Sequence, residues 1–327
     1  MKNIESFQNS LLKISQSDFD NHAMDLFRFQ AVHNPVYKSY LDFIDIDPFT
    51  ISKIEDIPFL PIEFFKHHII KTNVWQPEIV FESSGTTQVI RSKHAIENLA
   101  FYHNHAQRLF EGCFGPLRGK TIIALLPSYL ERQGSSLVSM VHYFIEQCGT
   151  DKAGFYLDEI ENLVSLLATT TDDDEVYLFG VTFALLDLAE QYSLDLSHVT
   201  IIETGGMKGR KEEIIKDELY DVMRTKLRVK RIYSEYGMTE LLSQLYGENG
   251  KFQPSPALKL LIRDINDPFT TLPPGKTGGI NIIDLANAHS CAFIETKDLG
   301  RINVDGSFEV LGRFDNADLR GCNLLVG

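Results

Sequence analysis

Between residues 78 and 234 the sequence alternates short β-rich runs with segments of helical periodicity, and this alternation constrains the fold more than any other feature. Short β-rich runs separated by helical periodicity indicate strands that alternate with helices. Strands that alternate with helices favour a largely parallel, doubly wound α/β sheet, in which ligands bind at the carboxyl ends of the strands. The predicted strands are EIVFES (78–83), TIIALLP (121–127), AGFYL (153–157), VYLFGV (176–181), VTIIETG (199–205) and KRIYS (230–234).

The segments between these strands have the spacing of amphipathic helices, and the flanking regions have a different character. We predict helices over 93–111, 136–147, 159–169, 183–191 and 210–226. Residues 1–77 are expected to be mainly helical, residues 78–257 to form the α/β part, and residues 258–327 to form an antiparallel β-subdomain. The expected strands of the last part are LKLLIRDI, TGGINIIDL, CAFIET, GRINV and SFEVLGR. Because no Ser/Gly-rich linker separates these parts, we expect residues 1–327 to form a single domain.

Composition excludes several classes of protein. The chain has 327 residues and a formal net charge of −14, and it has no cluster of Lys and Arg of the kind that binds nucleic acid. No apolar run approaches the ~18–20 residues that cross a bilayer, and the first residues lack the apolar core of a secretory signal, so we expect a cytoplasmic protein without membrane insertion. The 4 cysteines are scattered, which predicts free thiols and neither a disulfide framework nor a zinc site.

One loop between a predicted strand and a predicted helix is rich in hydroxyl groups. In FESSGTTQVIR (81–91), backbone N–H groups and hydroxyls can converge on phosphate oxygens, the glycine permits close approach, and Arg91 supplies a positive charge. The Walker A pattern is absent. The alternative is an ordinary Ser/Thr/Gly turn. The candidate phosphate-binding residues are Ser83, Ser84, Gly85, Thr86 and Thr87.

Three further motifs follow predicted strands. IIETGGMKGRKEE (201–213) contains Gly205 and Gly206, but its glycines lack the G-x-G-x-x-G spacing of a dinucleotide site, and they equally suit a tight turn. YSEYGMTELLSQ (233–244) places an aromatic ring near Glu240, a residue able to hold Mg²⁺. In TKDLGRI and GRFDNADLRG, Asp298 can accept hydrogen bonds from ribose hydroxyls and Arg313 can bind phosphate or ribose oxygens, although both segments also suit β-turns.

The order of these motifs is more specific than any one of them. SSGTT, ETGG, SEYGMTE, PPGKTGG, TKDLGR and GRFDNADLRG, in this order, resemble the adenylate-forming superfamily of acyl-CoA synthetases and luciferases. Within it, the chain is most similar to the acyl-protein synthetase (LuxE-type) family, through LLPSYLERQGSSLVSMV (125–141), ETGGMKGR and RGCNLL. HNPVYKSYLDF and IPFLPIEFFK also resemble phenylacetate–CoA ligases. The resemblance extends from about residue 30 to the end.

The resemblance implies ATP-dependent activation of a carboxylic acid, in particular a fatty acid, to an acyl-adenylate, with ATP and Mg²⁺ bound. By position, it assigns residues 83–87 to the phosphate loop, Tyr236 to the adenine side, and Thr239 with Glu240 to the phosphates and Mg²⁺. Gly237 is counted with them as a cofactor-binding residue. In the same way, Asp298 matches the family's ribose-binding aspartate, and Arg313 matches the arginine that comes after that aspartate in the family.

Two departures from the superfamily pattern stand out. Gln88 and Arg91 replace the usual Gly and Lys of the phosphate loop, and only 15 residues follow Gly312, so the small mobile C-terminal domain is expected to be absent. The acyl-protein synthetases transfer the acyl group to a cysteine near the C-terminus, and Cys322 stands at that place. The expected partner is an acyl reductase subunit or a carrier protein. Two alternatives remain open: an acyl-CoA or acyl-carrier-protein ligase, and a non-catalytic nucleotide-binding subunit of a reductase complex.

Overall fold

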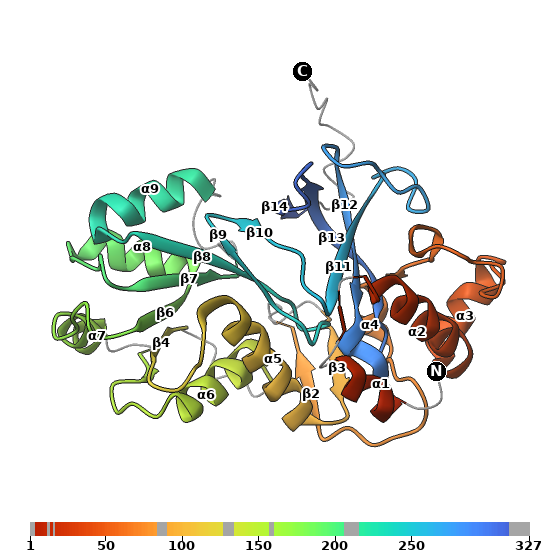
Figure 1. Cartoon of the computed structure of the whole chain (residues 1–327), viewed down its shortest axis with the longest axis horizontal. Helices are drawn as coiled ribbons and strands as arrows, with labels where there is room; N and C mark the ends of the chain where they lie inside the picture. Colours follow the sequence, from red (N-terminus) through yellow and green to blue (C-terminus); the bar gives the residue numbers. More distant parts are fainter. Residues whose placement is uncertain are drawn as a thin grey trace. The chain divides into compact units, whose positions relative to one another are not determined.

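The chain folds into two compact units. A computed structural model describes residues 4–11, 14–15, 17–83, 90–126, 134–156, 160–205 and 216–313. One unit combines residues 1–78, 88–97 and 253–327, and the other combines residues 79–87 and 98–252. In Figure 1 the first unit therefore contains both the red N-terminal helices and the blue C-terminal strands. The second unit contains the predicted parallel sheet.

The second unit is built on a sheet with strand order β5-β4-β6-β7-β8-β9-β10. The first five strands in this order run parallel, and β9 and β10 continue the sheet as antiparallel strands. Near-continuous apolar runs form the central strands, and every residue of β6 and β7 is buried. The strands of this sheet are β4 (Thr121–Leu125), β5 (Gly154–Phe155), β6 (Val176–Val181), β7 (Thr200–Thr204), β8 (Arg231–Tyr236), β9 (Leu245–Glu248) and β10 (Lys251–Phe252), and β2 (Ile79–Glu82) lies outside it.

Helices cover this sheet on both faces, which explains why its central strands are apolar throughout. In the view of Figure 1, α5 and α6 lie on one side of the sheet and α8 and α9 on the other. The prediction of a doubly wound, largely parallel α/β sheet is therefore confirmed for this unit. The helices are α5 (Leu99–Phe114), α6 (Ser136–Cys148), α7 (Ile160–Leu167), α8 (Thr182–Gln191) and α9 (Lys216–Leu227).

The predicted helix over 93–111 is wrong at its beginning. Residues Lys93–Ile96 form a strand, β3, and α5 begins only at Leu99. The boundary is set by Asn98, whose side-chain oxygen accepts a hydrogen bond from the backbone N–H of Phe101 at 2.8 Å. This contact is an N-cap, so the helix cannot extend toward the N-terminus past Asn98. An Asn followed by an apolar periodic segment was the available sequence signal.

The first unit contains an antiparallel sheet with strand order β11-β12-β13-β14, and the short β1 pairs with β13 in parallel. This confirms the predicted antiparallel strands in the C-terminal part. The two strands predicted over 291–296 and 300–304 form one continuous strand, in which Leu299 pairs with both β12 and β14 and Asp298 pairs with β14. The strands are β1 (Leu60–Pro61), β11 (Leu258–Arg263), β12 (Thr277–Asp284), β13 (Phe293–Ile302) and β14 (Phe308–Arg313).

The N-terminal helices pack against the β12–β13 connection of the same unit. Gln30 is completely buried, and its side-chain NH₂ group donates to the carbonyl oxygens of Asn287, Ala288 and Ser290. These bonds satisfy backbone groups of a buried connection, which would otherwise destabilise the fold. The remaining elements are α1 (Ile4–Leu11), α2 (Phe19–His33), α3 (Pro35–Phe43), η1 (Ile54–Asp56), α4 (Phe64–His67) and η2 (Leu285–His289).

We predict that Phe27→Ala lowers the free energy of unfolding by about 3–5 kcal/mol, because a fully buried ring is replaced by a cavity. Phe27 of α2 packs edge to face on Phe293 of β13, with ring centroids 5.7 Å apart, and so joins the helices to the strands. Phe43→Ala is the matched control, since the Phe43 ring is 88% exposed. Urea unfolding would measure both variants, and equal losses would contradict the packing described here.

Candidate functional site

Two adjacent strands of the second unit, β7 and β8, end side by side. Their parallel register places Thr204 opposite Glu235, so Gly205 and Tyr236 follow at the same edge of the sheet. Gly205 has φ = 65°, a left-handed conformation that glycine adopts without steric cost and that lets the chain turn sharply off the sheet. This edge is the carboxyl end of a parallel sheet, where ligands of doubly wound folds bind.

The last residue of β8 and the loop that follows it contain four of the predicted site residues. Glu240 is 5% exposed and Tyr236 is 8% exposed, whereas Gly237 and Thr239 are partly accessible. The Tyr236 ring packs against Phe252 of β10, with centroids 5.9 Å apart. This packing fixes the ring of Tyr236 within its unit, so only its accessible edge is available to a bound base.

Beneath this edge lies a chain of buried polar side chains that sequence reasoning missed. The carboxylate of Glu203 on β7 accepts hydrogen bonds from the hydroxyls of Thr182 and Ser234, the latter at 3.0 Å. Ser234 in turn accepts from the hydroxyl of Tyr220 at 2.6 Å and from the Nζ of Lys216 at 3.2 Å. Glu203 is 6% exposed, and these donors compensate for the loss of water around its charge. An acidic residue inside the apolar run IIETG was the sequence signal.

A second carboxyl group, that of Glu235, lies on the neighbouring strand. Its Oε2 accepts a hydrogen bond from the hydroxyl of Thr204 at 2.5 Å. Burial raises the pKa of Glu235 to about 7, the Thr204 hydrogen bond opposes this shift, and the nearby Glu203 adds to it. Gly237 leaves room for this group, because a Cβ there would lie 2.4 Å from Glu235 Oε1. The segment SEYG therefore holds a carboxyl group that changes charge near neutral pH.

Helix α5 supports the end of the same loop. His105 Nε2 lies 2.8 Å from the hydroxyl oxygen of Ser243, and both residues are buried. Burial and the nearby Arg108 lower the pKa of His105 to about 3, so the imidazole is neutral at physiological pH. His105 therefore acts as a neutral hydrogen-bonding group that ties the loop to α5.

The first unit contains the predicted ribose-binding residue and its arginine. Asp298 of β13 is paired with Arg313 of β14, and the Arg313 Nε lies 3.3 Å from Asp298 Oδ1. The Asp298 side chain is 11% exposed and that of Arg313 is 72% exposed, so the carboxylate is held in the sheet while the arginine reaches solvent. Two residues from separate sequence motifs are thus brought into direct contact.

Arg91 lies in the first unit and Ser83 in the second, and both are partly exposed.

The remaining predicted residues lie outside the described part of the chain. They are Ser84, Gly85, Thr86, Thr87, Gly206 and Cys322.

No family model and no curated protein matches this sequence. Solved structures do match. One is 2-hydroxyisobutyryl-CoA ligase in complex with 2-HIB-AMP and CoA, with a TM-score of 0.69 and 14% identity over 92% of this chain and 70% of that one. Another is ATP-bound MatB from Rhodopseudomonas palustris, with a TM-score of 0.53 and 19% identity over 72% of this chain and 47% of that one. The chain has the fold of the adenylate-forming ligases.

At these identities, the likeness to the adenylate-forming ligases concerns the fold. The chain spans about half the length of the MatB structures that it matches, at 47%. It corresponds to their large N-terminal domain, with a parallel core and antiparallel C-terminal strands.

Among the described residues, no helix has the length and apolar character needed to cross a bilayer. In the same described ranges, no group of three or more His, Cys, Asp or Glu side chains is arranged to hold a metal ion.

We predict that Glu235→Gln removes a pH dependence of stability. A carboxyl whose pKa is raised by folding binds its proton more tightly in the folded protein, so the free energy of unfolding falls as pH rises from 4.5 to about 7. Gln cannot ionise, so the free energy of unfolding of the variant should not fall in this way. Between pH 5 and pH 8, wild type should lose about 2 kcal/mol more of this free energy than the variant, allowing for partial exposure of the site.

Urea unfolding at these two pH values would measure the difference. Glu248→Gln, which changes an exposed carboxylate on the next strand, should keep the wild-type slope. A wild-type slope in Glu235→Gln would show that Glu235 does not titrate in this range.

Proposed function

We propose that this protein uses ATP to convert a carboxylic acid into an acyl-adenylate and then transfers the acyl group to a protein thiol. A fatty acid is the proposed substrate class, in line with the sequence resemblance. The observation that carries the proposal is the adenylate-forming fold together with the position of the motifs, which follow the carboxyl ends of β7 and β8 or lie on adjacent strands of the C-terminal sheet. Ligands of such folds bind at strand ends.

In the first step, a carboxylate oxygen of the acid attacks the α-phosphorus of ATP. The bond from this phosphorus to the bridging oxygen breaks, and pyrophosphate leaves. Reactions of this kind depend on positioning and on neutralising charge. We assign Ser83 and residues 84–87 to the β- and γ-phosphates, Arg91 to the neutralisation of charge, and Asp298 with Arg313 to the ribose.

The end of β8 and the loop after it carry further assignments. Tyr236 is assigned to the adenine side, and Gly205, Gly206 and Gly237 are assigned to nucleotide binding. Thr239 and Glu240 are assigned to the phosphates. Because Glu240 is a buried carboxylate beside a hydroxyl residue, this pair offers the hard oxygen ligands that Mg²⁺ takes together with substrate phosphates. Bound there, Mg²⁺ would supply charge neutralisation on the phosphates.

In the second step, a thiolate attacks the acyl carbon of the adenylate and AMP leaves. Cys322 is the proposed first acceptor, since it lies where the acyl-protein synthetases carry their acylated cysteine, and an acyl reductase subunit or a carrier protein is the proposed final partner. A CoA ligase is the second candidate, because the matched 2-hydroxyisobutyryl-CoA ligase structure contains CoA. The two candidates share the first step and differ in the thiol.

We predict pyrophosphate exchange into ATP that depends on added acid. Fatty acids of graded length, assayed beside aryl acids, should identify the preferred class. Glu240→Gln should lower the exchange rate by about 10²-fold, because a charged group acting on the phosphates is lost. Glu218→Gln, an exposed residue of α9, is the matched control. Tight ATP binding without exchange across the whole panel of acids would instead support a non-catalytic nucleotide-binding subunit.

We predict that Cys322→Ala separates the two steps. The variant should keep the wild-type rate of exchange but should lose the acyl label that wild type retains after denaturation and that hydroxylamine releases. Cys113→Ala, which removes an exposed thiol, is the control and should keep the label. Acyl transfer that survives Cys322→Ala and requires CoA would replace the proposed thiol with that of CoA.

A further inference from the structure

The strand that bears Asp298 is irregular at the position of this residue. On one side of an interruption in the β12–β13 ladder, Gly279 pairs with Leu299, and on the other Asn281 pairs with Glu295. One residue of β12, Ile280, therefore faces residues 296–298 of β13. A bulge of this kind re-aims side chains and removes regular ladder bonds.

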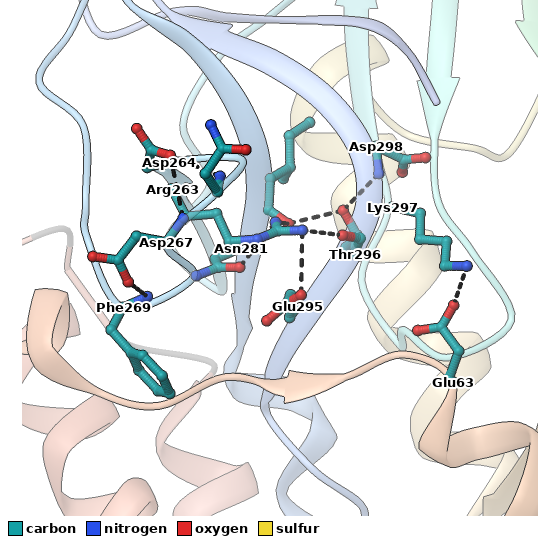
Figure 2. Close-up of polar contacts among 12 residues, drawn as sticks. Glu63, Arg263, Asp264, Asp267, Phe269, Asn281, Glu295, Thr296, Lys297 and Asp298 are labelled. Carbon is teal, nitrogen blue, oxygen red and sulfur yellow. Dashed lines mark hydrogen bonds and ion pairs between the residues drawn. The ribbon is translucent and has the colours of Figure 1, made fainter. Parts of the chain in front are cut away.

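The guanidinium group of Arg263, on β11, fills this interruption (Figure 2). Its Nη1 donates to the carbonyl oxygen of Ile280 at 3.1 Å and to Oδ1 of Asn281 at 3.2 Å. Its Nη2 donates to the carbonyl oxygen of Thr296 at 2.8 Å. The side chain is only 4% exposed, so these bonds replace both water and the missing ladder.

The connection continues from Arg263 to Asp298 through one side chain. The hydroxyl of Thr296 donates to the carbonyl oxygen of Ile280 at 2.8 Å and accepts from the backbone N–H of Asp298 at 3.1 Å. Arg263 and Thr296 thus share one acceptor, and Asp298 is the next group in the same network. The position of the Asp298 backbone follows from where the guanidinium lies.

The neighbouring residues are adapted to this buried charge. Gly279 pairs with Arg263 across β11 and β12, and a Cβ on Gly279 would lie 2.4 Å from the Arg263 Cζ. Oε1 of Glu295 lies 3.4 Å from Arg263 Nη2. Burial lowers the pKa of Arg263, while Glu295, Glu63 and Asp298 act in the opposite direction. The acceptors of this guanidinium therefore lie on the interrupted ladder and on the adjacent Glu295.

We propose that Arg263 is a positioning residue for ribose recognition: it holds the bulge at 296–298 in the conformation that presents the Asp298 carboxylate to the hydroxyls of a bound nucleotide. This inference rests on the proposed function. It adds to that function a residue that lies in none of the motifs and that acts through Asp298 without touching the nucleotide.

The test compares ATP with 2′,3′-dideoxyATP, which lacks the ribose hydroxyls. In the acid-dependent exchange assay, wild type should have a KM for ATP about tenfold or more below that for the dideoxy form, as expected for a hydroxyl bonded to a carboxylate. In Arg263→Lys this ratio should fall toward one, as in Asp298→Asn. The double variant should show no further loss, because both changes act on one interaction.

Binding of AMP and dideoxyAMP, measured by calorimetry, provides the same ratio without catalysis. Arg301→Lys is the matched control, since Arg301 lies on β13, as Asp298 does, but pairs with Glu309 and has a side chain that is 40% exposed. The ratio for this variant should stay that of wild type. Thr296→Val removes the hydroxyl that links the Ile280 carbonyl oxygen to the Asp298 N–H and keeps the side chain at a similar size, and it decides the question if Arg263→Lys does not fold.

The inference is overturned if Arg263→Lys or Thr296→Val weakens both nucleotides equally and keeps the ratio, since that is the signature of general destabilisation. If wild type catalyses exchange but has the same KM for ATP and for the dideoxy form, the inference is overturned while the proposed function is kept. If wild type binds no ATP, both the inference and the proposed function are overturned.

Discussion

Parallel strands covered by helices on both faces can hold polar groups only where the strands end, and this constraint determines the organisation of the second unit. Every residue of β6 and β7 is buried, so a charged side chain in their centres would have no water and few donors. Glu203 lies at the end of β7, and Glu235 lies one step further along on β8. The residues that follow, Gly205 and Tyr236, are therefore at an edge of the sheet where polar groups can be placed.

Each buried charge near the candidate site is matched by donors or acceptors supplied by neighbouring elements. Glu203 is surrounded by hydroxyls from α8 and β8, and Arg263 by carbonyl oxygens and a carboxylate of β12 and β13. Removing one partner from such a group leaves an uncompensated charge, which costs more than the interaction contributes when it is complete. These networks thus hold the strand ends in defined positions, and they thereby fix where the loops that follow the strands begin.

Much of this architecture could be predicted from the sequence because its signals are local. The apolar runs, the glycine at the end of β7 and the order of the motifs all depend on neighbouring residues. The helix predicted from residue 93 was wrong because apolar periodicity alone does not show where a cap interrupts it, and Asn98 does so. The single strand β13 was divided in the prediction, because its continuity depends on pairing with β12 and β14 rather than on its own composition.

The sequence by itself determined the fold class and the positions of Glu240, Asp298 and Arg313 in motifs, since strand formation and motif spacing are properties of short segments. Only the tertiary structure decided that Asp298 contacts Arg313, that Glu235 lies beside Thr204 with a raised pKa, and that Arg263 fills the interruption beside Asp298. These relations join residues on different strands. They depend on the register of the sheet and on the loss of water around buried charges, neither of which can be read from one segment of the chain.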